Sequence, residues 1–299
     1  MLPPDRSHVS TEQRNPRSER LHELDVAGFV ALMNAENRLV IAALDAAAPA
    51  LSAFITDVEP GFVAGGRLIY VGAGTSGRLG VLDASEAPPT FQVEPGRVVG
   101  IIAGGDGALR KSSEGKEDEF HGAHAELTAL QLTSRDALIG IAAGGSTPYA
   151  LGAISFAKAA GARTAFMTCV TVDKPTDADH LIVLASGPEI LTGSTRLKAG
   201  TATKLALNTI STALMVRAGK VYGNLMIDVR ATNSKLRDRA ARIIATLTGL
   251  DRTASFTLLD QAAGSAKIAV VMQRLKLDRQ QAEARLNVTH GRLDQLFPG

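Results

Sequence analysis

Residues 70–91 read YVGAGTSGRLGVLDASEAPPTF, which joins a glycine-rich loop to the carboxylate pair Asp83 and Glu86. An apolar strand over Arg67–Val71 precedes it, and a helix is expected to begin near Gly77. Between them lie residues that permit a tight turn or offer hydroxyl donors: Gly72, Gly74, Thr75, Ser76 and Gly77. Free amides at a helix start, helped by the helix dipole, favour an anion such as phosphate. The stretch therefore predicts a phosphate-binding loop.

Other interpretations of this loop remain open. The letters GAGTSG match the dinucleotide fingerprint G-x-G-x-x-G, which is weak evidence by itself. A dinucleotide site also needs an acidic residue at the end of the second strand, whereas here that strand ends in Gly104-Gly105 and Asp106 comes late. A P-loop is excluded because no G-K-[ST] follows the glycines. A nucleotide site and a purely structural turn stay as alternatives to a sugar-phosphate loop.

Composition narrows the class of protein. The chain has 299 residues, of which 45% are hydrophobic and only 4% aromatic, a pattern that favours helices packed on a parallel sheet over a β-sandwich. A formal charge of +2 argues against nucleic-acid binding driven by bulk charge. Cys169, the single cysteine, excludes an intrachain disulfide and is expected in the core. The amino terminus has no apolar signal core and no apolar run reaches the ~18 residues needed to span a bilayer, so we expect a cytoplasmic protein without a membrane partner.

Apolar runs alternate with helical stretches along the chain, which predicts a doubly wound α/β sheet. The expected strands are Leu68–Val71, Val98–Ala103, Ala137–Ala142, Thr164–Val170 and Leu181–Ala185. The expected helices include Gly77–Leu82, His121–Gln131, Pro148–Ala160 and Thr195–Ala218, with a helical pattern from Val26 that breaks at Pro60. We expect an amino-terminal arm over 1–25, a sugar-phosphate domain over 26–233 and a helical domain over 234–299. Ligands of such sheets bind at the carboxyl ends of the strands, where a second glycine loop, 144–147, also falls.

The carboxyl-terminal segment contains a faint repeat. Leu250-Asp251-Arg252 recurs as Leu277-Asp278-Arg279, and Leu259 and Gly264 recur as Leu286 and Gly291 at the same offset. Short helices with glycine at their ends fit this pattern. Packing or dimer contact is the expected role.

The acidic residues near the first loop are candidates for acid–base chemistry. Asp83 and Glu86 follow the loop directly, and Pro88-Pro89 should end a helix at or before Ala87 and hold Glu86 at a rigid corner. Glu114 and Glu117 lie at helical spacing in EGKEDE, although a solvated acidic turn would look the same. The six histidines are scattered and form no ligand pattern, so no metal is expected.

Four long blocks carry a family resemblance, and they lie at 70–91, 104–119, 144–162 and 189–240. Together with TEQRN at 11–15, they resemble the N-acetylmuramic acid 6-phosphate etherases, a family of the sugar isomerase (SIS) group that also contains the glucokinase regulatory protein. The resemblance implies cleavage of the D-lactyl ether of N-acetylmuramic acid 6-phosphate by elimination and hydration. It implies no cofactor or metal, and it implies a homodimer.

The resemblance also implies roles for individual residues. Glu86, in the D-A-S-E-x-P-P-T-F block, matches the acid that protonates lactate, and Glu117, in E-G-x-E-D, matches the base at C2. The residues implied in holding the phosphate or the sugar are Gly74, Thr75, Ser76, Gly77, Glu114, Ser146, Thr147, Ser194 and Lys198. The second loop departs from the family pattern, because many members read S-G-R-T-P-Y where this chain reads GGSTPY. A non-catalytic sugar-phosphate sensor and an aldose–ketose phosphate isomerase are the alternative functions.

Overall fold

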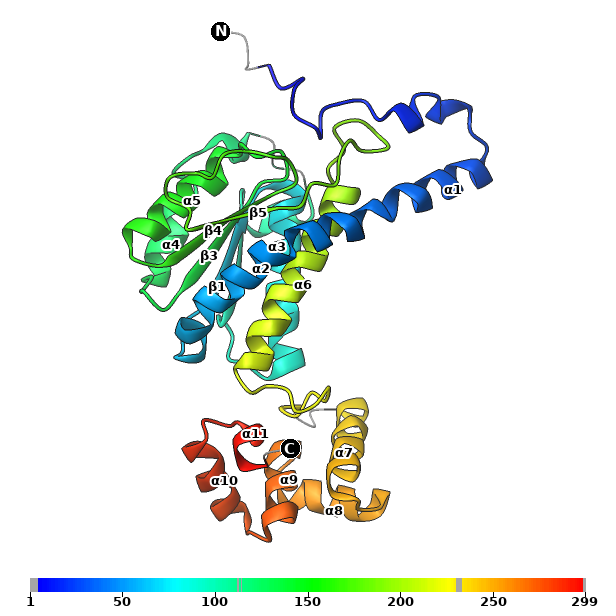
Figure 1. The fold of residues 1–299 in the computed structure, drawn as a ribbon. Coiled ribbons are helices and arrows are strands. Elements are labelled where there is room, and N and C mark those ends of the chain that lie inside the picture. Colours follow the sequence, from blue (N-terminus) through cyan, green and yellow to red (C-terminus); the bar gives the residue numbers. More distant parts are fainter. Residues whose placement is uncertain (1–4, 112, 114, 230–232, 298–299) are drawn as a thin grey trace. The chain divides into compact units, whose positions relative to one another are not determined.

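The computed structural model describes residues 5–111, 113, 115–229 and 233–297, and the chain forms two compact units. The first unit comprises Met1–Ser85 and Gly96–Ser211, and the second comprises Glu86–Pro95 and Thr212–Gly299. The first carries the β-sheet, and the second consists largely of short helices (Figure 1).

The first unit is built on one parallel sheet with the strand order β2-β1-β3-β4-β5. Its strands are β1 (Leu68–Gly72), β2 (Val98–Ile102), β3 (Ala137–Ile141), β4 (Arg163–Thr168) and β5 (His180–Val183). Every residue of β1 and β3 is buried, as expected for parallel strands covered on both faces. The sheet confirms the α/β class predicted from the sequence.

Helices cover both faces of this sheet (Figure 1). On one face lie α4 (His124–Leu130) and α5 (Pro148–Ala159). On the other lie α2 (Leu39–Val63), α3 (Gly74–Phe91) and α6 (Lys198–Arg217), with α1 (Val26–Asn37) leading into α2. Short 3-10 turns, η1 (Pro16–Ser18), η2 (Leu21–Glu23), η3 (Asp106–Leu109) and η4 (Lys116–Asp118), complete the unit.

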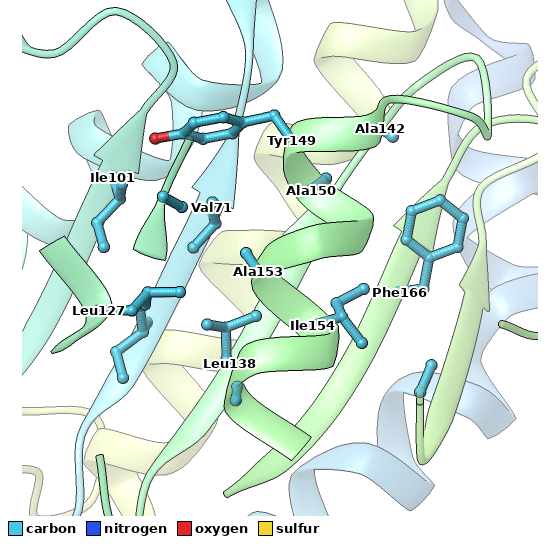
Figure 2. Close-up of a cluster of buried hydrophobic side chains, with 14 of the residues drawn as sticks. Val71, Ile101, Leu127, Leu138, Ala142, Tyr149, Ala150, Ala153, Ile154 and Phe166 are labelled. Carbon is cyan, nitrogen blue, oxygen red and sulfur yellow. The ribbon is translucent and has the colours of Figure 1, made fainter. Parts of the chain in front are cut away.

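Small residues let α5 approach the sheet closely (Figure 2). Ala150 and Ala153 are fully buried, and a Cβ added to Gly140 of β3 would lie only 2.7 Å from Cδ1 of Ile154. The cluster is completed by larger side chains from the strands and from α4: Val71, Leu127, Leu138 and Phe166. This dense packing holds the strand ends, and with them the loops that follow β1 and β3.

Prolines inside helices correct two of the expected helix ends. We expected a break at Pro60 and a helix end before Pro88-Pro89, but α2 continues past Pro60 and α3 runs through both later prolines. An interior proline removes one backbone hydrogen bond and crowds the turn before it. Burial of side chains that lie beside or beyond the prolines offsets this cost, and those side chains are Phe62, Ala87 and Phe91.

The segment Val26–Val63 is long and apolar enough to cross a membrane by length and composition alone. However, α2 turns a full row of side chains into the first unit, from Val40 to Phe62, and it packs on β3 and β5. This burial identifies α2 as a core helix. Only 28% of the most apolar window of the segment is buried, because α2 buries one face and leaves the other exposed. Apolar side chains of α1, such as Val26 and Val30, are exposed as well.

Asp136 joins the amino ends of β1 and β3. Its carboxylate accepts hydrogen bonds from the backbone N–H of Arg67 (2.8 Å), from the Arg67 guanidinium (2.8 and 3.0 Å) and from the backbone N–H of Thr133 (2.8 Å). Burial alone would raise the pKa of this carboxyl, but the hydrogen bonds from Arg67 and Thr133 outweigh burial and lower the pKa to about 2.

Asp136→Asn should therefore destabilise the protein at neutral pH and much less in acid. Because the folded-state pKa lies below the unfolded value, the charged Asp136 contributes stability above pH ~4, and this contribution is lost as the pH falls toward 2. The gap in free energy of unfolding between wild type and variant should be about 2 kcal/mol at pH 7 and should narrow at pH 3. Urea denaturation at pH 7 and pH 3 measures this difference in free energy of unfolding. An equal difference at the two pH values would contradict a stabilising role for the charged Asp136.

The second unit contains α7 (Ser234–Thr248), α8 (Arg252–Gln261), α9 (Ala266–Leu275), α10 (Arg279–Val288) and α11 (Leu293–Leu296). The sequence repeat corresponds to a structural repeat. Asp251 caps α8 and Asp278 caps α10 through side-chain hydrogen bonds to backbone N–H groups. Each of these helices ends in a left-handed pair, Ala263-Gly264 and His290-Gly291, before the next helix begins.

Candidate functional site

The strand order makes the boundary between β1 and β3 a topological switch point. Their neighbours β2 and β4 lie on opposite sides, so the connections from the two strands run in opposite directions along the sheet. Ligands of open α/β sheets bind at such a switch point, outside the carboxyl ends of the strands. The segment after β1 (72–77), which includes the first turn of α3, and the loop after β3 (142–147) both lie at this edge. The two glycine loops predicted from the sequence therefore flank one candidate site.

The first loop is shorter than expected, because α3 begins at Gly74 rather than near Gly77. The first intrahelical bond of this turn runs from the Gly77 N–H to the Ala73 carbonyl. The amides of Gly74, Thr75 and Ser76 thus precede the helix ladder and belong to its electropositive end. Gly74 has φ +54 with open space around its Cβ position, while Thr75 is half-buried and Ser76 is buried. This end of α3 has the geometry of an anion site.

Gly77 permits the close approach of α3 to β1. A Cβ at Gly77 would lie 2.5 Å from the Gly72 carbonyl oxygen and 2.6 Å from Cγ1 of Ile102. No real side chain tolerates such distances. Gly77 is therefore needed for packing, whatever its part in ligand binding.

The second loop borders a cavity. Gly145 has φ +78 and lies against Val170 and Val172, while Ser146 is exposed and Thr147 directly precedes α5. A cavity of about 520 Å³ opens here, and it is lined by the loop, by the segment after β4 and by the amino-terminal arm: Asp5, Arg6, His8, Val9, Ser10, Gly144, Gly145, Ser146, Val170, Thr171 and Val172.

The fourth block, 189–240, reaches the first loop through α6. A Cβ at Gly200 would lie 3.3 Å from Cγ2 of Thr75, so the first turn of α6 lies beside the first turn of α3. Ser194, half-buried, lies in the loop that enters α6. The start of α6 is already occupied by the buried Glu189 carboxylate, which accepts the N–H groups of Lys198 (3.0 Å) and Ala199 (2.9 Å).

Lys198 is buried in an ion cluster of the protein itself. Its Nζ donates to Oε2 of Glu36 at 2.6 Å, and both side chains are almost fully buried. Asn15 donates to the same oxygen at 2.8 Å, and Arg17 lies 2.9 Å from Oε1. Burial would raise the pKa of Glu36, but the bonds from Lys198 and Asn15 outweigh it and lower the pKa. The predicted role of Lys198 in anion binding remains a prediction beside this observed pairing.

The two candidate catalytic carboxylates lie on different elements. Glu86 is exposed on α3 and falls in the second compact unit. Glu117 is exposed in η4, which packs against α5 in the first unit. Glu114 lies outside the described residues. Asp83, which the sequence groups with Glu86, is buried and accepts hydrogen bonds from Tyr70 (2.9 Å) and Ser211 (3.3 Å), a structural role.

Sequence reasoning missed the residues that come from the arm and from α1. Nothing in the letters around Arg6 or His8 indicated that they border the second glycine loop. Glu36 gave a faint signal, because it is the only charged residue in a largely apolar helix. Among the residues that the structure describes, no three His, Cys, Asp or Glu side chains gather as a metal site would require.

Comparisons with known proteins show what this chain resembles. The family described as the glucokinase regulatory protein N-terminal SIS domain matches residues 50–158. An N-acetylmuramic acid 6-phosphate etherase of Synechococcus sp. (strain CC9605) is 52% identical over 94% of this chain and 90% of its own. An etherase of the same name from Gloeobacter violaceus is 52% identical over 90% of this chain and 88% of its own. A solved phosphoheptose isomerase from Francisella tularensis aligns with a TM-score of 0.43 and 17% identity, over 62% of this chain and 98% of that chain.

Proposed function

Since the chain belongs to the N-acetylmuramic acid 6-phosphate etherase family, we propose that it cleaves the D-lactyl ether of N-acetylmuramic acid 6-phosphate. The products are N-acetylglucosamine 6-phosphate and D-lactate, and the protein is a carbon–oxygen lyase. The identity with these etherases, which extends over nearly the full length of both chains, is the observation that carries this conclusion.

The phosphate of the substrate is held at the start of α3. The amides of Gly74, Thr75 and Ser76, together with the two hydroxyls, supply donors there, and the helix dipole adds favourable potential. Ser146 and Thr147, at the end of the neighbouring strand, supply further hydroxyl contacts to the sugar or its phosphate. The closeness of both loops to the β1–β3 switch point supports this assignment.

The chemistry needs one base and one acid. In the ring-opened sugar the C2 proton is α to an aldehyde, so Glu117 removes it and the electron pair forms the C2–C3 double bond. The C3–oxygen bond breaks, and Glu86 gives its proton to the departing lactate oxygen. Water then adds at C3 and a proton returns to C2, with the roles of the carboxyls reversed. Such help is worth about 10²–10⁴-fold at each step. Both carboxyls are exposed, Glu86 on α3 and Glu117 in η4.

A D-lactate assay with purified protein tests the function. N-acetylmuramic acid 6-phosphate should yield equal amounts of D-lactate and N-acetylglucosamine 6-phosphate. The match to the regulatory SIS domain favours a second candidate, a non-catalytic sugar-phosphate sensor, which would bind the substrate and release no lactate. An isomerase would instead convert a simple hexose 6-phosphate. Either of these outcomes would replace the etherase assignment.

The partner that we propose is a second copy of the chain. Apolar side chains on α1 remain exposed in the single chain, and among them Val26 is 82%, Val30 50% and Phe29 41% exposed. Covering such a row stabilises an assembly through the hydrophobic effect. Light scattering at micromolar concentration should report a dimer for the wild type and a shift toward monomer for Val30→Asp. A wild type that is monomeric throughout would contradict the proposal.

A further inference from the structure

We infer that the amino-terminal arm supplies the recognition site for the lactyl carboxylate, with Arg6 as the residue that binds it. This inference rests on the proposed function, because it concerns which part of that substrate the arm contacts. The substrate carries two separate anionic groups, the phosphate and the lactyl carboxylate. The start of α3 provides for one anion, so the other needs a second cationic or donor-rich surface.

The cavity beside the second glycine loop has the chemistry for a lactyl group. Arg6 and His8 line it from the arm, and Val170 and Val172 line it from the segment after β4. A guanidinium binds a carboxylate through two parallel hydrogen bonds, and the valine side chains suit the lactyl methyl group. Ser146 lies on the same cavity wall, so the sugar held by the second loop would present its C3 substituent to this space.

The Arg6 side chain is available for a ligand. It is exposed, and within the part of the chain that the structure describes it makes no ion pair. The neighbouring acid, Asp5, is engaged by Ser7, whose backbone N–H and hydroxyl donate to its two oxygens at 2.9 and 3.1 Å. The carbonyl of Arg6 accepts the Val9 N–H at 2.9 Å, which holds this segment in a turn.

Buried contacts further along the arm hold the turn over the loop. Thr11 is fully buried, and its carbonyl accepts the Gly193 N–H at 3.1 Å. Asn15, also buried, bonds to both Glu36 and the Pro188 carbonyl. Because both anchors follow the turn closely in sequence, Arg6 is presented by a docked segment rather than by a loose end.

The lactyl group distinguishes the substrate from its sugar product, so Arg6 should act on substrate selectivity. Arg6→Ala should raise the KM for N-acetylmuramic acid 6-phosphate by about 10- to 100-fold, the effect of losing a charged hydrogen-bond pair. The inhibition constant of N-acetylglucosamine 6-phosphate, which lacks the carboxylate, should stay within about twofold. Arg6→Lys should recover part of the loss because it restores the charge without the planar pair of donors.

Arg14→Ala is the matched control, since Arg14 is an exposed arginine of the same arm that does not line the cavity. It should leave both constants unchanged. An unchanged KM in Arg6→Ala would overturn the inference, and so would an equal rise in the KM and in the inhibition constant, which would assign Arg6 to the sugar or to the fold. If the wild type releases no D-lactate at all, the proposed function fails instead. Calorimetric binding of the two sugar phosphates to wild type and Arg6→Ala would then still show whether Arg6 discriminates between them.

Discussion

Glu86→Gln should abolish D-lactate release while the protein stays folded. The side chain is exposed on α3, and the amide has nearly the same shape as the acid, so the free energy of unfolding should change by less than about 0.5 kcal/mol. The amide has no proton to give to lactate, and the loss of general acid catalysis lowers kcat by about 10²–10⁴-fold. A coupled D-lactate assay with N-acetylmuramic acid 6-phosphate as substrate measures this loss in kcat.

Proton exchange separates the two carboxyl roles. In D₂O, Glu86→Gln should still exchange the C2 proton of the substrate, because Glu117 can remove and return it without loss of lactate. Glu117→Gln should lose both exchange and lactate release. Glu94→Gln, which changes an exposed glutamate just after α3, is the control and should behave as wild type. Exchange that survives in Glu117→Gln but disappears in Glu86→Gln would reverse the assignment, and normal turnover in Glu86→Gln would remove this residue from the mechanism.

Lys198→Met should cost about 3–5 kcal/mol of stability, the largest structural effect that we predict. The substitution leaves the Glu36 carboxylate buried, with Asn15 and the half-exposed Arg17 as its remaining partners. Urea denaturation measures the loss. Lys158→Met removes a lysine that is 42% exposed and paired with Asp179, and this control should cost no more than about 1 kcal/mol.

A second variant separates a structural role of Lys198 from a ligand-binding role. Glu36→Gln combined with Lys198→Met should recover part of the lost stability, because no unpaired charge is then buried. If Lys198→Met were as stable as the control and instead raised the KM for the phosphorylated substrate, the lysine would act on the ligand, as the family resemblance implies. A large loss that the double variant relieves would assign Lys198 to the fold.

Local chemistry allowed most of the fold to be predicted. Each buried strand is a short apolar run bounded by glycine or polar residues, and strand–helix alternation requires parallel pairing. Asp251 and Asp278 cap their helices through hydrogen bonds to backbone N–H groups only three residues away. The repeat of these capped helices could therefore be recognised in the sequence. The glycines at 72, 74 and 77 likewise act on the adjacent backbone. Interactions that close within one turn can be predicted from the sequence because their partners are close along the chain.

The helix ends show where that reasoning stops. The prolines of α2 and α3 oppose helix locally, and the helices continue because side chains beside and beyond them are buried elsewhere in the fold. Whether such burial outweighs a lost hydrogen bond depends on neighbours that the local pattern does not contain. Helix α3 begins at Gly74, earlier than the expected start near Gly77, for a related reason. Its first turn packs against the end of β1, where Gly77 permits the close approach.

A parallel α/β sheet with two glycine loops at its carboxyl edge could be predicted from the residue pattern, and the likeness to a known family pointed to two glutamates. Only the tertiary structure paired Lys198 with Glu36, buried Asp83 against Tyr70, and brought Arg6 to the second loop. Each of these contacts joins residues that belong to separate elements or segments. The energy of such a contact depends on the burial of its groups and on the distance between them in the folded chain. Neither quantity can be derived from the local sequence.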